Sequence, residues 1–319
     1  MPALLQSTLF IVLGIAAMLW AAEALSRNAE KIAIRFGIPE FIIGVTLVAL
    51  GTSLPELISS VFAVSSGRPE IVITNVVGSN VTNILLVLGV AAIVAKKLTV
   101  SFNILHVDLP IFITATFLFC LSVLDGKVSR FEGFIMVAAL IVYILYVVGY
   151  RKEHDGSEIT KFRTRKKITK WSYIEFALGG VALFFGARLA ISSIINVSEM
   201  LNINPETVSI TAFALGTSLP ELFVSVSAAK KGLGDIVVGN VIGSSIFNLF
   251  GGIGIPAVWK AIPVSENLLL FLVPITVVTA LVYIFTTQEK QITKWEGWIL
   301  LLFYCFFIGQ VVGFFNVLR

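Results

Sequence analysis

Two glutamates, Glu56 and Glu221, each lie about halfway along a segment of apolar residues. If these segments cross a membrane, burying each carboxylate costs at least a few kcal/mol, so an intramembrane glutamate is a functional candidate by default. A glutamate kept only for structure is the simpler explanation for one such residue. A structural role explains two such glutamates less well. Both follow the same residues, GTSLP, in distant parts of the chain, so their occurrence together would have to be accidental. We therefore interpret both carboxylates as ligands for a cation.

Hydroxyl groups accompany each glutamate at helical spacing. Thr52 and Ser53 precede Glu56 by four and three residues, which places all three on one face of a helix. That face would present only oxygen atoms to a ligand. The second copy repeats the arrangement with Thr217, Ser218 and Glu221.

A proline lies between the hydroxyl residues and each glutamate. Pro55 and Pro220 lack the amide hydrogen that a helix uses, and a nearby glycine in each motif makes bending easier. We expect the preceding turn to be disturbed and backbone carbonyl groups near Ala49 and Ala214 to be freed. Such carbonyl oxygens are also cation ligands.

A second polar row occurs in the apolar segment that follows. Ser79 and Asn83 are four residues apart and share a helix face, so we interpret them as further ligands. Asn75 lies one turn earlier, and for it we favour hydrogen bonds that join neighbouring helices. The second copy has Ser244, Asn248 and Asn240 at the same positions.

These residue types favour a hard cation. Ca²⁺ accepts six to eight oxygen ligands in flexible geometry, whereas Mg²⁺ requires a small octahedral shell and dehydrates reluctantly. Transition metals would need imidazole or thiolate ligands. The two histidines, His106 and His154, fall near a span end and in the central loop, and Cys120 and Cys305 form no CxxC pattern. The chemistry therefore points to Ca²⁺ and similar ions.

The composition indicates a membrane protein. Of the 319 residues, 57% are hydrophobic and 13% are charged, against roughly 25% charged in a soluble domain. At about 20 apolar residues per span, the chain holds on the order of ten helices and no sizeable soluble domain. We expect the spans near residues 4–23, 40–64, 70–94, 107–124, 132–149, 172–191, 206–229, 235–259, 267–286 and 296–315.

The chain contains an internal duplication. GTSLPEL occurs at 51–57 and 216–222, and NVVGSNVTN at 75–83 recurs as NVIGSSIFN at 240–248, both with an offset of 165 residues. Each half holds an odd number of expected spans, so the second half must enter the membrane from the opposite side. Inverted repeats of this kind build transporters whose substrate site lies near the membrane midplane, between interrupted helices of the two halves.

We therefore expect an all-α membrane protein of ten transmembrane helices in two inverted five-helix repeats. Residues 1–150 form the first repeat, with ion-site motifs at 49–83, and residues 171–319 form the second, with motifs at 214–248. The basic segment 151–170 joins them. Most of the 23 lysines and arginines fall on one side if this segment is inside the cell. The positive-inside rule then predicts a cytoplasmic loop and two external termini in the cell membrane.

At these motifs the chain resembles the cation/calcium antiporter superfamily, and in particular the prokaryotic sodium/calcium exchanger branch. The resemblance covers nearly the whole chain and rests on the doubled GTSLPE and the doubled GS-x-x-x-N. It implies a ten-helix fold in which the second and third helices of each half enclose the ion sites. It also implies that the first and sixth helices move as a gate.

The resemblance implies roles for individual residues as well. Glu56 and Glu221 would be central Ca²⁺ ligands, and Thr52 and Thr217 would contact both Ca²⁺ and Na⁺. Close prokaryotic relatives often carry Asp where this chain has Asn248, which puts in doubt a proton-titrating or potassium-binding role at that position. The Na⁺ contacts would be Ser53, Ser79, Ser218 and Ser244, joined by the carbonyl groups of Ala49 and Ala214.

We predict a secondary antiporter that exchanges Na⁺ for Ca²⁺ by alternating access and is not an enzyme. It needs no cofactor, and its partners are the two ions and the lipid bilayer. No nucleic acid or protein partner is implied, and ten spans allow a monomer to function. Antiport of H⁺ against Ca²⁺ or another divalent cation is the alternative, since an intramembrane glutamate can carry a proton.

Two other classes have some support in the sequence. A cation channel would also use rings of oxygen ligands. Residues 232–235 (GLGD) look like the GxGD signature of intramembrane aspartyl proteases, which need a second intramembrane aspartate. The other aspartates, Asp108, Asp125 and Asp155, fall at expected span ends or in a loop, so the protease interpretation is weak.

Overall fold

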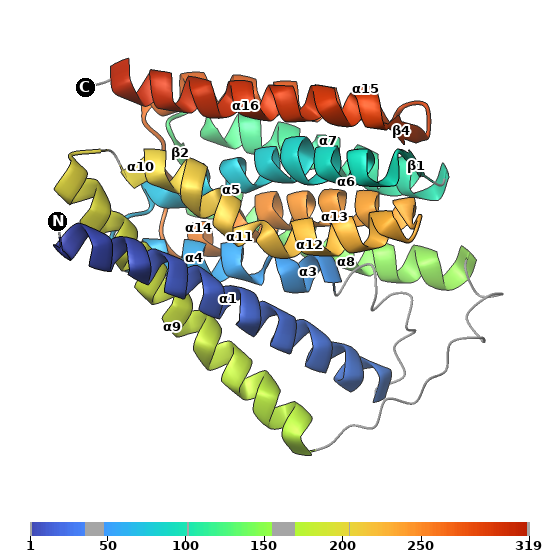
Figure 1. Cartoon of the computed structure of the whole chain (residues 1–319), viewed down its shortest axis with the longest axis horizontal. Coiled ribbons are helices and arrows are strands. Elements are labelled where there is room, and N and C mark those ends of the chain that lie inside the picture. Colours follow the sequence, from blue (N-terminus) through green and yellow to red (C-terminus); the bar gives the residue numbers. More distant parts are fainter. Residues whose placement is uncertain (1, 36–47, 101, 155–169, 204, 318–319) are drawn as a thin grey trace.

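The computed structural model describes residues 2–35, 48–100, 102–154, 170–203 and 205–317. Within these ranges the protein is almost entirely helical (Figure 1). Six helices there are long and apolar enough to cross a membrane, or seven if the bent pair Pro205–Thr217 and Leu219–Lys230 is one span. Two shorter apolar helices are Leu54–Ser65 and Asp108–Val123. The helical membrane protein is confirmed, and the division into ten spans stays a prediction.

The first half of the chain consists of helices with two short strands among them. Its elements are α1 (Pro2–Arg35), α3 (Val48–Thr52), α4 (Leu54–Ser65), α5 (Glu70–Val81), the π-helical segment η2 (Thr82–Val87), α6 (Leu88–Ala95), β1 (Lys97–Thr99), α7 (Phe102–Val123), β2 (Lys127–Val128) and α8 (Arg130–His154). The expected span 40–64 begins outside the described residues, and most of the basic segment 151–170 lies outside them too.

The second half follows the same order of elements. They are α9 (Lys170–Leu201), α10 (Pro205–Val208), the π-helical segment η3 (Ser209–Phe213), α11 (Ala214–Thr217), α12 (Leu219–Lys230), α13 (Gly234–Phe247), the π-helical segment η4 (Asn248–Ile253), α14 (Gly254–Trp259), β3 (Ile262–Pro263), α15 (Glu266–Thr287), β4 (Gln291–Thr293) and α16 (Lys294–Val317).

Two continuous helices form the centre of the protein. One runs through α5, η2 and α6, and the other through α13, η4 and α14. In their apolar windows 83% and 89% of the residues are buried, against 17% for α1. A helix that is apolar almost all round is buried in the centre of a bundle. The Ser and Asn residues of the motifs are buried with it.

The halves are interlocked through glycines at corresponding positions. Gly89 in α6 packs against the backbone of Gly297 in α16, and Gly254 in α14 packs against the backbone of Gly133 in α8. Small residues let membrane helices approach closely, which compensates for the lack of a hydrophobic driving force in lipid. Each central helix is thereby held by an outer helix.

Short strands and caps fix the helix ends. Strand β1 pairs with β4, and β2 pairs with β3, so each pair joins the two halves of the chain. The backbone amide of Ser129 donates to Glu132 at 2.7 Å, and that of Thr293 donates to Glu296 at 2.6 Å. This S/T-x-x-E arrangement is the capping box of a helix N-terminus, and the two examples lie at corresponding positions of the two halves.

Helices α1 and α9 form a pair that crosses the outside of the bundle at an angle (Figure 1). They have 34 and 32 residues, about 50 Å at 1.5 Å per residue, which is longer than a hydrocarbon core of about 30 Å. Gly14 and Gly186 bring the two backbones together, because a Cβ added to either would lie within 2.9 Å of the other's carbonyl oxygen.

Replacing Gly133 by alanine should destabilise the contact between α8 and α14. The added Cβ would lie 2.7 Å from the Cβ of Ala257 and 2.8 Å from the backbone nitrogen of Val258, so the helices must separate. Overpacking of this kind costs about 1–3 kcal/mol. The expected result is a lower midpoint of thermal unfolding in detergent for Gly133→Ala.

Gly180→Ala is the matched control, because no atom of the described structure lies within 4 Å of its added Cβ. It should unfold at the temperature of the native protein or slightly above it, because alanine favours a helix more than glycine does. Equal midpoints for the two variants would contradict the close packing described for α8 and α14.

Candidate ion-binding site

Both candidate glutamates lie just after a break in a helix. Thr52 ends α3 and Leu54 begins α4, with Ser53 between them at φ −87° and ψ 3°. The second half breaks at Ser218 with φ −83° and ψ 4°, and the two parts differ in direction by 40°. Each proline occupies the first turn after the break, where its missing amide hydrogen is tolerated. The prediction of an interrupted helix at each motif is confirmed.

The carbonyl groups of Ala49 and Ala214 themselves keep hydrogen-bond partners. The carbonyl oxygen of Ala49 accepts the amide of Ser53 at 3.2 Å, and that of Ala214 accepts the amide of Ser218 at 3.2 Å. A proline removes the bond to the carbonyl four residues earlier, which belongs to Gly51 or Gly216. Ala49 and Ala214 accept the Thr52 and Thr217 hydroxyls as well, at 3.2 and 3.3 Å.

Glu56 and Glu221 are fully buried, each in the first turn of its helix. The N-terminal end of a helix carries a partial positive charge that stabilises a carboxylate. The two breaks therefore supply a favourable field at the position of each glutamate. In the described part of the chain no salt bridge reaches either carboxylate.

Hydroxyl groups connect the two halves at this point. The Ser53 hydroxyl donates to Oε1 of Glu221 at 3.1 Å, which joins the motif of the first half to the glutamate of the second. Thr52 lies beside Glu221, and Thr217 lies beside Glu56. The motifs, 165 residues apart in the sequence, thus meet in one buried cluster.

The serines of the central helices complete this cluster. Ser79 donates to Oε1 of Glu56 at 3.4 Å and lies 3.4 Å from the Thr217 hydroxyl oxygen. Ser244 donates to Oε1 of Glu221 at 3.3 Å and lies 3.5 Å from the Thr52 hydroxyl oxygen. We define the site by these residues together: Thr52, Ser53, Glu56, Ser79, Thr217, Ser218, Glu221 and Ser244.

Several buried oxygens of the site have no hydrogen-bond partner within the described ranges. They include Oε2 of both glutamates and the Ser218 hydroxyl. Leaving a buried acceptor unsatisfied costs about 1–3 kcal/mol, and more for a charged group. A cation between the carboxylates would satisfy these acceptors, and the donor set of carboxylates and hydroxyls fits a hard ion.

The asparagines near the site differ in their contacts. Asn248 donates its amide to Oδ1 of Asn80 at 3.2 Å, and its own Oδ1 is buried without a partner among the described residues. Neither polar atom of Asn83 has a partner there. No described side-chain hydrogen bond joins three of the twelve predicted ligands to the glutamates, namely Asn83, Asn248 and Ser218, and of these only Ser218 belongs to a glutamate motif.

Asn80 was missed by the analysis of the sequence. It donates to the carbonyl oxygen of Ser245 at 3.2 Å and so links α5 to α13, and both residues are buried. The signal was present, because Asn80 and Ser245 occupy the same repeat position next to the predicted serines. Their role here is to hold the two central helices together beside the site.

Asn75 and Asn240 join neighbouring helices as predicted. Asn75 donates to the Ser59 hydroxyl at 3.2 Å, and Asn240 donates to the Ser225 hydroxyl at 3.1 Å. Each bond connects a central helix to the broken helix that carries a glutamate. The position of that glutamate along the central helix is therefore fixed by a polar contact.

Glycines bring the broken helices against the central ones. A Cβ on Gly78 would lie 2.8 Å from the Cβ of Ala214, and one on Gly243 would lie 3.0 Å from the Cβ of Ala49. Gly216 accommodates Ile15 of α1, whose Cδ1 would lie 2.5 Å from an added Cβ. Helix α1 therefore packs directly beside Thr217.

Asp108 lies at the start of the apolar segment Asp108–Val123 of α7, which agrees with the predicted span end, and it is 3% exposed. It accepts a hydrogen bond from Tyr143 at 3.2 Å. Asp235 of the GLGD sequence is exposed at the start of α13. An aspartyl protease needs two intramembrane aspartates, and Asp235 is exposed, so the burial of Asp108 does not support the protease interpretation.

Comparisons with known proteins identify relatives along the whole chain. The family model described as sodium/calcium exchanger protein matches residues 6–149 and 171–312. The sodium/calcium exchanger MaX1 of Methanosarcina acetivorans is 32% identical over 94% of this chain and 97% of its own. The inner membrane protein YrbG of Escherichia coli is 32% identical over 80% of each chain.

A solved structure with the same fold is that of the sodium-calcium exchanger NCX_Mj soaked with 10 mM Na⁺ and 10 mM Sr²⁺. It is 29% identical to this chain, with a TM-score of 0.67 over 96% of this chain and 98% of that one. The likeness therefore extends from the sequence to the arrangement of the helices.

Gly216→Ala should destabilise the contact between α1 and α11, because the new methyl group would collide with Cδ1 of Ile15. The expected loss is about 1 kcal/mol or more in stability, measured by thermal unfolding in detergent. Ile15→Val deletes that same Cδ1 atom, so the double variant should regain most of the loss. Simple additivity of the two single effects would show that these residues are not coupled and would contradict the contact.

Proposed function

Because the chain belongs to the sodium/calcium exchanger family, whose members are membrane antiporters of cations, we propose that it exchanges Na⁺ for Ca²⁺ at the site containing Glu56 and Glu221. The observation that carries this proposal is the pair of fully buried carboxylates, one from each half, each with an oxygen that accepts no hydrogen bond within the described ranges. Two carboxylates balance the charge of one Ca²⁺. They are well suited to a divalent ion in an otherwise apolar bundle.

The serine and threonine hydroxyl groups of the site can adapt to either Na⁺ or Ca²⁺. A hydroxyl either donates to a carboxylate or turns a lone pair toward a cation. Thr52 and Thr217 would contact both ions. The carbonyl oxygens of Ala49 and Ala214, which now accept these two hydroxyls, would join them when the hydroxyls turn away. The Na⁺ contacts would be Ser53, Ser79, Ser218 and Ser244, with Asn83 and Asn248 as neutral dipoles nearby.

Alternating access follows from the relation between the halves. The motifs repeat at an offset of 165 residues, and the family model matches two segments that correspond to the two halves. In Figure 1, α1 begins and α16 ends at one end of the molecule, whereas α8 ends at the other. These observations support ten spans in two inverted repeats, with ions bound near the midplane between them.

The orientation in the membrane follows from charge. With the basic segment 151–170 in the cytoplasm, most of the 23 lysines and arginines lie on the inner side, and both termini are external. The site is formed within a single chain, so a monomer is sufficient for transport. No cofactor takes part in the proposed cycle.

Glu56→Gln and Glu221→Gln should each abolish calcium transport, because each removes one of two charges from the divalent site. The folded yield should not fall, since neutralising a buried carboxylate relieves its desolvation. The measurement is Na⁺-driven ⁴⁵Ca²⁺ uptake into proteoliposomes. Glu266→Gln, at an exposed glutamate outside the site, is the matched control and should transport normally. Near-native uptake by either site variant would remove that glutamate from the mechanism.

Exchange should be electrogenic and independent of K⁺. Na⁺ and Ca²⁺ are similar in size, so one oxygen cluster can hold either a single Ca²⁺ or several Na⁺. We propose more than two Na⁺ per Ca²⁺, so net positive charge moves with Na⁺ and the membrane potential drives transport. Calcium flux at clamped potentials, with and without K⁺, measures this. Flux driven only by a pH gradient would favour H⁺/Ca²⁺ antiport, and flux without any counter-ion would indicate a channel.

A further inference from the structure

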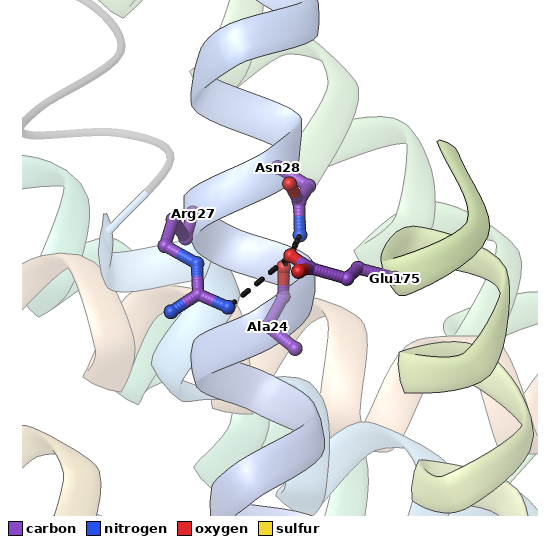
Figure 2. Close-up of polar contacts among 4 residues, drawn as sticks. All are labelled: Ala24, Arg27, Asn28 and Glu175. Atoms are coloured by element: carbon purple, nitrogen blue, oxygen red, sulfur yellow. Dashed lines mark hydrogen bonds and ion pairs between the residues drawn. The ribbon is translucent and has the colours of Figure 1, made fainter. Parts of the chain in front are cut away.

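Helices α1 and α9 are joined by a polar cluster at one end of their contact (Figure 2). Oε2 of Glu175 in α9 accepts two hydrogen bonds from α1. One comes from Nη2 of Arg27 at 3.2 Å, and the other comes from Nδ2 of Asn28 at 3.0 Å. We call Arg27, Asn28 and Glu175 the clasp.

The clasp has a buried part and an exposed part. Asn28 is fully buried, and its Nδ2 also donates to the carbonyl oxygen of Ala24 at 2.8 Å, which fixes the direction of the amide. The side chains of Arg27 and Glu175 are 50% and 42% exposed. Water screens the ion pair more than the part-buried bond from Asn28, whose donor is fully buried. The charge-assisted bond from Asn28 is therefore the stronger link between the helices.

The clasp exists at one end of the pair only. At the repeat offset of 165, the counterparts of Arg27 and Asn28 are Ser192 and Ser193, and the counterpart of Glu175 is Phe10. Ser192 donates to the carbonyl oxygen of Arg188 in its own helix. Helices α1 and α9 occupy equivalent positions in the two repeats, but the clasp is not repeated. It joins the two helices near the start of α9, the helix that follows the basic segment 151–170.

The contacts between this pair and the rest of the bundle are of a different kind. Ile15 of α1 packs on Gly216, and Phe184 of α9 meets Phe62 of α4 edge to face, with ring centroids 5.8 Å apart. These two contacts are apolar and lie over the two broken helices. One ion pair also joins α9 to the bundle, Glu199 with Arg68 at 3.7 Å, but both side chains are exposed, so water weakens it. Apolar contacts impose little directional constraint, whereas a hydrogen-bonded carboxylate holds its partners at one distance and angle. Sliding is therefore easier between the pair and the bundle than within the pair.

We propose that Arg27, Asn28 and Glu175 are positioning residues that tie α1 to α9, so that the two helices move across the site as one body. This inference rests on the function proposed above, because alternating access requires an element that moves relative to the glutamates. Without the clasp, each helix would move separately, and the two halves of the site would open out of step. Transport would slow, while the ligands themselves would remain in place.

A cross-linking experiment tests the clasp in the full chain with Cys120 and Cys305 replaced by serine. Arg27→Cys with Glu175→Cys removes the clasp, and Na⁺-driven ⁴⁵Ca²⁺ uptake should fall by about tenfold, the equivalent of one charge-assisted hydrogen bond. Equilibrium Ca²⁺ binding in detergent should stay unchanged. A bifunctional thiol reagent with a flexible spacer should then restore uptake, because it replaces the lost tie.

The matched control links the pair to the bundle. Phe62→Cys with Phe184→Cys joins α9 to α4, so cross-linking there should stop uptake. Loss of uptake on linking positions 27 and 175, or unchanged uptake in the unlinked variant, would overturn the proposal.

A second measurement does not depend on transport. Spin labels at the exposed positions Glu23 in α1 and Tyr173 in α9 report the distance between the helices. Glu175→Ala should broaden that distance distribution, and an unchanged distribution would overturn the clasp as a tie. If the parent protein shows no Na⁺-driven uptake, the proposed function fails, and the spin-label result still decides whether the clasp holds the helices together.

Discussion

The burial of two carboxylates within an apolar bundle is the constraint on which the rest of the structure depends. Glu56 and Glu221 are fully buried, and no salt bridge in the described ranges compensates them. Desolvating two negative charges is expensive, so the surroundings must favour them or an ion must neutralise them. Two broken helices direct their positive ends at the glutamates, and serine and threonine hydroxyls surround them. Together these groups stabilise the negative charge without neutralising it, as the proposed binding and release of a cation requires.

Close helix packing holds this cluster in position. Gly78, Gly243 and Gly216 let backbones and small side chains meet around the site, and Asn75 and Asn240 tie the broken helices to the central ones. Because the packing at the site is tight, access for an ion requires a rearrangement of whole helices rather than of a few side chains. The long α1–α9 pair packs over both breaks mainly through apolar contacts, with one exposed ion pair between Glu199 and Arg68, and it is the element that we propose to move.

Much of the candidate site could be predicted from the sequence because its motifs occur twice, once in each half of the chain. The repeated GTSLPEL and the Ser–Asn spacing identified the glutamates and hydroxyls, and Pro55 and Pro220 predicted the breaks. The details of hydrogen bonding could not be read in this way. A proline indicates which amide is missing, but the carbonyl groups of Ala49 and Ala214 keep their own partners through the geometry of the turn. The burial of Asp108 and the clasp depend on tertiary contacts, in the second case between residues 148 positions apart.

Anomalous X-ray diffraction from crystals of the native protein grown with Sr²⁺ as a Ca²⁺ substitute tests the central claim most directly. The account predicts a strong anomalous peak between the carboxylates of Glu56 and Glu221, within coordination distance of both, and its disappearance when Na⁺ is raised. A strong peak elsewhere in the protein, with none between these two carboxylates, would contradict it.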